Sequence, residues 1–233
     1  MSMLNAPKTV SRRQELREDQ LATATARSMT FFEEHRTLLI AAALGLLVII
    51  IGAIVFSWWQ GQQDIEAAEA LGAVLASYEQ GNLEQALDGT AGQPGLLAIA
   101  DEYGSTATGN LATFYAADAL YQLGRYEDAL RYFEQYDAGS DILGASALAG
   151  EAAIHEQQGD HAEAARLYRR AADAYASAAT TPDYLMAAGR NYEASGDYAE
   201  AQEVYQAYLD AYEGTPNAPL VEALMARAAA EAQ

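Results

Sequence analysis

The chain has 233 residues, a formal net charge of -20 at pH 7, 51% hydrophobic residues and no cysteine. The lack of cysteine excludes disulfides, thiolate metal ligands and cysteine nucleophiles. Because a chain this acidic repels a phosphate backbone, nucleic acid is not an expected partner.

An uncharged apolar stretch of 22 residues runs from Leu38 to Trp59. At a rise of 1.5 Å per residue, a helix of this length crosses the roughly 30 Å hydrocarbon core of a bilayer. Its apolar side chains favour insertion by roughly 4 to 8 kcal/mol. Trp58 and Trp59 fit the aromatic belt at one interface, and Phe31 and Phe32 are expected near the other. A buried core helix is rarely apolar on every face, and a signal peptide is shorter and ends at small residues. We therefore expect an uncleaved transmembrane helix over 38–59.

The basic residues around this stretch predict its orientation. Six Lys and Arg lie in residues 1–37, whereas none lies between residue 60 and Arg125. Basic flanks stay on the cytoplasmic side. The charge divides in the same way, with +1 for residues 1–37 and -21 for residues 60–233. We therefore expect a single-pass protein of the inner (cell) membrane, with a cytoplasmic arm (1–37) and a periplasmic C-terminal domain (60–233).

A short phrase recurs four times in residues 60–233. Each copy begins with a glycine and has an alanine five residues later, and the glycines are separated by 43, 35 and 37 residues. Glycine is suited to end a helix in the left-handed conformation, and alanine lets two helices approach closely. An aromatic residue follows nine residues after each of the last three glycines. The glycines, alanines and aromatic residues are Gly81, Gly124, Gly159 and Gly196; Ala86, Ala129, Ala164 and Ala201; and Phe133, Tyr168 and Tyr205.

This phrase resembles the tetratricopeptide repeat, a helix–turn–helix unit of about 34 residues. The resemblance implies an all-α solenoid with repeats around residues 67–103, 110–140, 145–180 and 182–213, the first of them degenerate. A loop is expected around Gly89 to Gly95, with Pro94 as the start of a helix. After breaks at Pro216 and Pro219, residues 220–230 are expected to form a capping helix. No alternating strand pattern competes with this interpretation.

A narrower resemblance comes from the arrangement of these parts. The stretch Phe31 to Arg36 leads into a single span, Trp58 and Trp59 follow, and Leu96 to Leu120 joins the first two repeats. Together they resemble the YfgM-like ancillary subunits of the SecYEG translocon. That family implies a membrane-anchored scaffold that binds translocon subunits, exported chains or periplasmic chaperones. Envelope proteins with similar repeats leave an alternative open, a complex-organising scaffold that is not linked to the translocon.

The sequence contains no recognisable catalytic or cofactor motif. Glu151 and His155 are four residues apart and could face one way on a helix, as metal ligands do, but no third ligand is evident. His35 lies beside the span, and His161 falls in a repeat turn. Neither a glycine-rich phosphate loop nor a Gly-x-Ser-x-Gly elbow is present. We predict no enzyme activity, no cofactor and no metal site.

The resemblance places the concave face of the solenoid on the first helix of each repeat, at positions 2, 5, 9, 12 and 13. The positions of the second repeat mix aromatic with polar side chains, as peptide-binding surfaces do. A site that binds a C-terminal carboxylate needs several Lys or Arg side chains, and these positions contain only Arg190. We therefore expect a ligand of basic or mixed character, or an unfolded segment. The positions are Leu111, Phe114, Asp118, Tyr121 and Gln122 in the second repeat; Ser146, Ala149, Ala153, Glu156 and Gln157 in the third; and Asp183, Met186, Arg190, Glu193 and Ala194 in the fourth.

Two alternatives remain for this surface. Leu111 or Phe114 would serve only to cover a neighbouring helix if the face binds nothing. The excess of Asp and Glu, with a single lysine, also fits adaptation to high salt, in which charge serves solvation rather than recognition.

Overall fold

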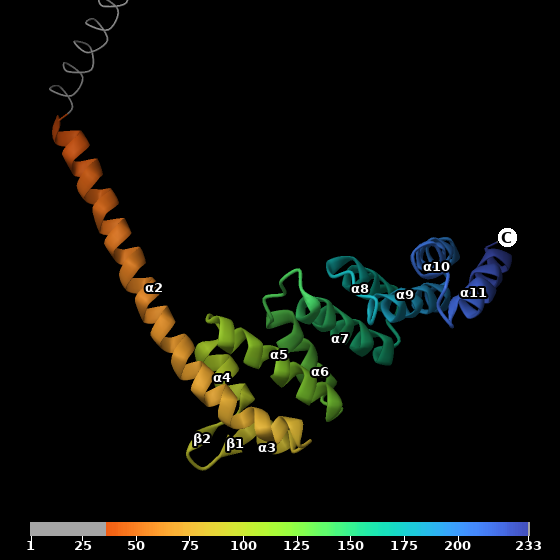
Figure 1. Ribbon diagram of the computed structural model, residues 1–233, viewed down its shortest axis with the longest axis horizontal. Helices are drawn as coiled ribbons and strands as arrows, with labels where there is room; N and C mark the ends of the chain where they lie inside the picture. The colour runs from red at the N-terminus through yellow and green to blue at the C-terminus, as the bar shows by residue number, and fades with distance from the viewer. Residues whose placement is uncertain (1–35, 233) are drawn as a thin grey trace, which may run out of the picture. The chain divides into compact units, whose positions relative to one another are not determined.

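The computed structural model describes residues 36–232, and these are almost entirely helical (Figure 1). The expectations for the arm up to residue 35, including those for Phe31, Phe32 and His35, lie outside the described residues. The chain separates into two compact units, Met1–Trp59 and Gln60–Gln233.

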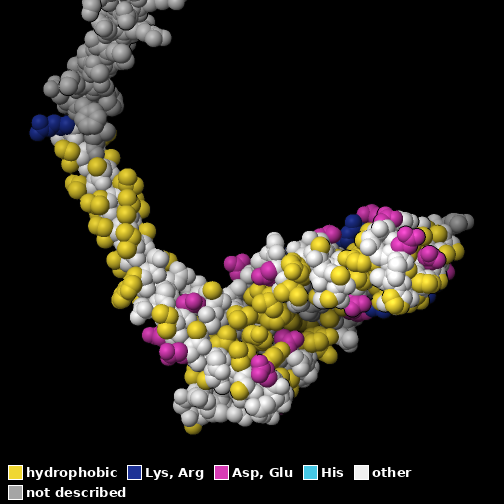
Figure 2. Space-filling model, in the orientation of Figure 1, with side chains coloured by type: hydrophobic (Ala, Val, Ile, Leu, Met, Phe, Trp, Pro, Cys, Tyr) yellow, Lys and Arg dark blue, Asp and Glu magenta, His cyan; other side chains and the backbone are white. Residues whose placement is uncertain are grey.

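The first described helix, α2 (Arg36–Glu79), contains the apolar stretch. Every residue from Ile40 to Trp59 is exposed, so no other part of the described chain covers these side chains (Figure 2). Among residues 36–232, α2 is the one helix that is long and apolar enough to cross a membrane. The remaining residues of α2, from Gln60 to Glu79, belong to the second unit and bury Ala67, Leu71 and Val74 in it.

From residue 107 onward the helices pair into hairpins. The second repeat consists of α5 (Ala107–Gln122) and α6 (Tyr126–Gln135), and the third of α7 (Ile142–Gln158) and α8 (His161–Ala174). The fourth consists of α9 (Thr181–Ser195) and α10 (Tyr198–Tyr212), and α11 (Ala218–Glu231) packs against α10. The expected all-α, tetratricopeptide-like solenoid is confirmed.

The four phrase glycines end their helices in the expected left-handed conformation. Their φ angles lie between 73° and 87°, a region that costs other residues energy. In each turn the N–H after the glycine donates to the carbonyl oxygen five residues earlier, as in a Schellman motif. These bonds, 2.8 to 2.9 Å long, join Asn82 to Ser77, Arg125 to Leu120, Asp160 to His155 and Asp197 to Tyr192. All four alanines of the recurring phrase are fully buried, as expected for residues at close helix contacts.

The first repeat departs from this pattern after its glycine. Its second helix is split into α3 (Leu83–Asp88) and α4 (Leu96–Tyr103). Between them β1 (Gly89–Thr90) and β2 (Gln93–Pro94) pair antiparallel. The prediction that Pro94 starts a helix is therefore wrong, because Gly89 and Gly92, both at positive φ, turn the chain back on itself. Proline is tolerated in so short a ladder because it lies at a sheet edge, where its missing N–H is not needed.

The capping helix begins earlier than expected. Pro219 does not break the chain before α11 but lies in the first turn of that helix. A proline is accommodated there because the first N–H groups of a helix have no partner inside it. Val221 and Ala228 bury one face of α11 against α10.

The core consists of two clusters that meet at α7. The first joins α2 to α6 and contains Ile154 of α7. The second joins α8 to α11 and contains Ala152 of the same helix. Of the first helices, α5 contributes to the first cluster, α9 to the second and α7 to both, and the predicted binding residues lie on these three helices.

Candidate protein-binding surface

The predicted concave-face residues lie on α5, α7 and α9 and keep part of their side chains exposed. On the face drawn in Figure 2, hydrophobic side chains gather over α5 to α7. Gln122, Gln157, Asp183, Arg190 and Ala194 are exposed; Leu111, Phe114, Asp118, Tyr121, Ser146, Ala149, Ala153, Glu156, Met186 and Glu193 are partly buried.

Phe114 packs within its own repeat. Its ring centroid lies 6.2 Å from that of Phe133 and 5.5 Å from that of Tyr136, at the end of α6. It also meets the edge of Tyr115 at 5.9 Å. Phe114 therefore covers a neighbouring helix, as the alternative interpretation expects. Only the part of its side chain that stays exposed is available to a partner.

Asp118 is tied to α2 and to its own helix. The Tyr78 hydroxyl donates a hydrogen bond to its carboxylate, and Gln122 Nε2 donates to the same oxygen at 2.5 Å. Burial, followed by the bond to Asp118, raises the pKa of Tyr78. Sequence reasoning missed Tyr78 because it assigned concave-face residues only to the last three repeats, although Tyr78 stands three residues before Gly81, as Tyr121 stands before Gly124.

Two glutamates of the predicted face form matching pairs with tyrosines. Tyr168 donates to Glu156 Oε2 at 3.1 Å, and Tyr205 donates to Glu193 Oε2 at 3.1 Å. The partners are 12 residues apart in both repeats, at positions 12 and 24 of the unit. Burial and then the neighbouring glutamate raise the pKa of both tyrosines. The recurrence of Glu and Tyr at this spacing was a signal that the sequence analysis left unused.

The fourth repeat adds an arginine to its pair. Arg227 of α11 donates from Nη2 and Nε to the two carboxylate oxygens of Glu193, at 2.5 and 3.1 Å. Arg190, Glu193 and Arg227 line an open depression of about 510 Å³, together with Ala194, Tyr198 and Glu231. Arg190 is therefore not the single cation of this face, although Arg227 is neutralised by Glu193.

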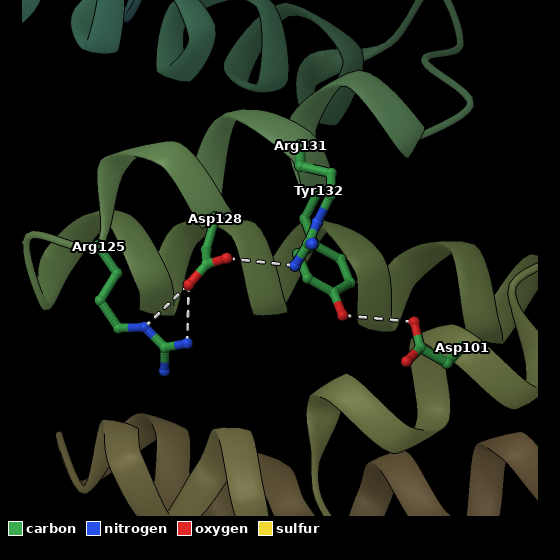
Figure 3. Close-up of polar contacts among 5 residues, drawn as sticks. All are labelled: Asp101, Arg125, Asp128, Arg131 and Tyr132. Carbon is green, nitrogen blue, oxygen red and sulfur yellow. Dashed lines mark hydrogen bonds and ion pairs between the residues drawn. The ribbon is translucent and has the colours of Figure 1, made fainter.

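The arginines of the second repeat are paired on α6 (Figure 3). Arg125 and Arg131 reach the Asp128 carboxylate at 2.8 and 3.3 Å. The Tyr132 hydroxyl donates to Asp101 of α4 at 3.3 Å, which joins the first two repeats. Both guanidinium groups are therefore paired with Asp128 of α6 and not with a carboxylate of α5 or α7.

The two histidines within the described residues, His155 and His161, act in packing. His161 Nδ1 lies 2.8 Å from Oδ1 of the buried Asn191, which links the third repeat to the fourth. His155 Nδ1 lies 3.6 Å from Asp160 Oδ2. Within residues 36–232, no three His, Asp or Glu side chains are grouped as ligands for a metal ion.

Glu151 is a partly buried carboxylate on α7, and burial raises its pKa, an effect that Arg170 partly offsets. Because the folded pKa exceeds the unfolded one, the wild type loses stability as the pH rises from the ordinary glutamate value through the folded value. Glu151→Gln is therefore expected to raise the urea midpoint at pH 7 and to lose this advantage at low pH. Glu213→Gln, at an exposed position, is the control, and an equal gain from both changes would contradict the role of burial.

Comparison with known proteins agrees with this architecture. The model of a family described as a tetratricopeptide repeat-like domain matches residues 29–229. Two crystal structures of nearly identical TPR-like repeats, assigned to a kinesin light chain of Podosopora anserina, are similar in fold. Each has a TM-score of 0.53 at 15% sequence identity, and each match covers 72% of this chain. The match covers 88% of the first structure and 87% of the second, which is a substituted variant. No curated protein matches the chain.

Proposed function

The chain belongs to the tetratricopeptide repeat-like domain family, and from that premise we propose that it is a membrane-anchored scaffold that binds proteins through α5, α7 and α9. A repeat solenoid presents an extended surface built from equivalent positions of successive units. The observation that carries the proposal is the partly exposed aromatic and acidic surface on these three helices.

The exposed apolar side chains of α2 support the anchor. Leaving apolar surface in water costs about 25 cal/mol per Å², and every residue from Ile40 to Trp59 is uncovered within the described chain. A bilayer removes this cost. The six Lys and Arg residues before the stretch, with none between residue 60 and Arg125, favour a cytoplasmic N-terminus and a repeat domain outside the inner membrane.

We propose that the partners belong to the protein export machinery: translocon subunits, exported chains or periplasmic chaperones. Support comes from the resemblance to YfgM-like proteins in the order of the parts, with a short arm, one apolar stretch and a repeat domain. The alternative, a scaffold that organises another envelope complex, shares the same surface and anchor.

In-cell photo-crosslinking separates these two functions. A photoreactive residue replaces Gln122 or Gln157, both exposed on the predicted face, and a control carries it at the exposed Glu213. We expect translocon subunits, exported chains or periplasmic chaperones to be linked from the first two positions and not from the third. Recovery of none of these classes would overturn the export assignment, and recovery of another envelope complex would establish the alternative.

A further inference from the structure

The third and fourth repeats contain the same glutamate–tyrosine pair, but only the pair of the fourth repeat is bonded to a cation of the protein. In the fourth repeat, Glu193 accepts from Tyr205 and also binds the Arg227 guanidinium through both of its oxygens. The Glu193 side chain is only 10% exposed. A charge pair with two parallel hydrogen bonds in such a site is among the stronger polar contacts in proteins.

Glu156 and Tyr168 repeat this geometry one unit earlier, with an identical hydroxyl-to-carboxylate distance of 3.1 Å. Within residues 36–232, no Lys or Arg side chain makes a hydrogen bond or ion pair with Glu156 at a salt-bridge distance. Arg190 follows Glu156 by the same 34 residues that separate Arg227 from Glu193. Instead of pairing with Glu156, it lines the depression beside Arg227 and is exposed.

Tyr121 holds in the second repeat the position that Glu156 holds in the third, three residues before the turn glycine, and its helix α5 contacts α7. Burial raises the pKa of Tyr121, and the neighbouring charges of Tyr126, Glu156 and Asp118 raise it further. The Tyr121 ring packs against Tyr126 at 5.5 Å and stays partly exposed. An aromatic face next to carboxylates attracts a cation by both the ring quadrupole and the negative charge.

We propose that Tyr121, Glu156 and Tyr168 form a cation cradle that binds a Lys or Arg side chain of a partner polypeptide. An apolar side chain next to that cation packs on the hydrophobic surface over α5 to α7. The proposal rests on the scaffold function above and names the chemistry of its partner. The fourth repeat serves as the internal example, because there the same pair holds a guanidinium from the protein itself.

The charge distribution supports a cationic partner. No Lys or Arg occurs from residue 60 to residue 124, although Asp and Glu are frequent there. The next two cations, Arg125 and Arg131, are engaged with Asp128. Arg190 opposes part of this negative charge, since it lowers the pKa of Tyr168, but it is not paired with Glu156. An incoming cation therefore meets a surface on which negative charge exceeds positive charge, which speeds its approach and selects against acidic segments.

Peptide binding to the full-length chain in detergent micelles tests the cradle by fluorescence polarisation. The probe is a short fluorescein-labelled peptide of glycine, serine, two phenylalanines and two arginines, with an amidated C-terminus. A second peptide carries citrulline, the uncharged analogue, in place of each arginine. We expect the arginine peptide to bind about tenfold more tightly than the citrulline peptide.

Variants assign this preference to the cradle. Glu156→Gln retains an acceptor for Tyr168 and is expected to remove the preference for arginine, whereas Glu213→Gln, with the same change of charge, is expected to keep it. Tyr121→Leu should weaken binding of the arginine peptide, whereas Tyr121→Phe should not, because phenylalanine keeps the aromatic ring. Arg190→Gln should leave binding unchanged or strengthen it. Circular dichroism confirms that each variant is folded.

Three outcomes overturn the cradle. They are an arginine preference that survives Glu156→Gln, equal loss in Glu156→Gln and Glu213→Gln, or weaker binding in Arg190→Gln. The last would show that the surface recognises an anion. In each case the crosslinking experiment still decides the scaffold function, so the two proposals fail separately.

Discussion

Replacing Tyr205 with alanine is expected to lower the free energy of unfolding by about 3 to 5 kcal/mol, the range for removal of a fully buried aromatic ring. Tyr205 is 0% exposed and lies in the core cluster that joins α8 to α11. Its ring fits against Gly189 of α9, where an added Cβ would lie 2.2 Å from a ring carbon. Because Gly189 has no side chain to fill the space that the ring leaves, the loss should be near the upper end. Urea unfolding of the full-length chain in micelles, followed by circular dichroism, measures it.

Tyr205→Phe is the matched control. It keeps the ring against Gly189 and removes only the hydroxyl that donates to Glu193. Since Glu193 remains bonded to Arg227, the expected loss is about 1 kcal/mol, typical of one hydrogen bond. Equal losses in both variants would contradict the view that ring packing dominates at this position.

The repeat turns could be predicted from sequence because they depend on local chemistry. A glycine at positive φ and an alanine at a close helix contact impose their requirements within a few residues. Gly159 and Ala164 therefore predicted the α7–α8 turn without any knowledge of the neighbouring repeats. The buried Tyr168 and Tyr205 followed from the same spacing.

The parts that were missed have two origins. Pro94 was predicted as a helix start because proline suits that position, whereas the local β1–β2 pairing also needs the turn at Gly89 and Gly92. The difference between Arg190 and Arg227 depends instead on residues distant in sequence. Both follow a glutamate by 34 residues, and only the stacking of successive helices decides which guanidinium reaches its carboxylate.

The second large effect concerns the apolar part of α2. Replacing Ile49 and Ile50 with aspartate places two charges near the middle of the stretch from Leu38 to Trp59. Each aspartate costs about 2.5 to 3.5 kcal/mol at the centre of a membrane helix and also removes a favourable isoleucine. Two of them offset most of the roughly 4 to 8 kcal/mol that favours insertion. We expect the double variant to leave the membrane fraction on extraction with alkaline carbonate, whereas the wild type remains.

The control for this variant keeps the added charge and changes only its place in the helix. Gln62 and Ala68 are exposed residues of α2 beyond Trp59, so aspartates there add the same charge outside the proposed hydrocarbon core. That variant should stay in the membrane fraction, because only the central pair has to be dehydrated on insertion. If the Ile49 and Ile50 variant also stayed, the apolar stretch would not be what holds the chain in the membrane. If both variants were released, charge alone, rather than its depth, would govern the result, and residues 38–59 would no longer account for the anchor.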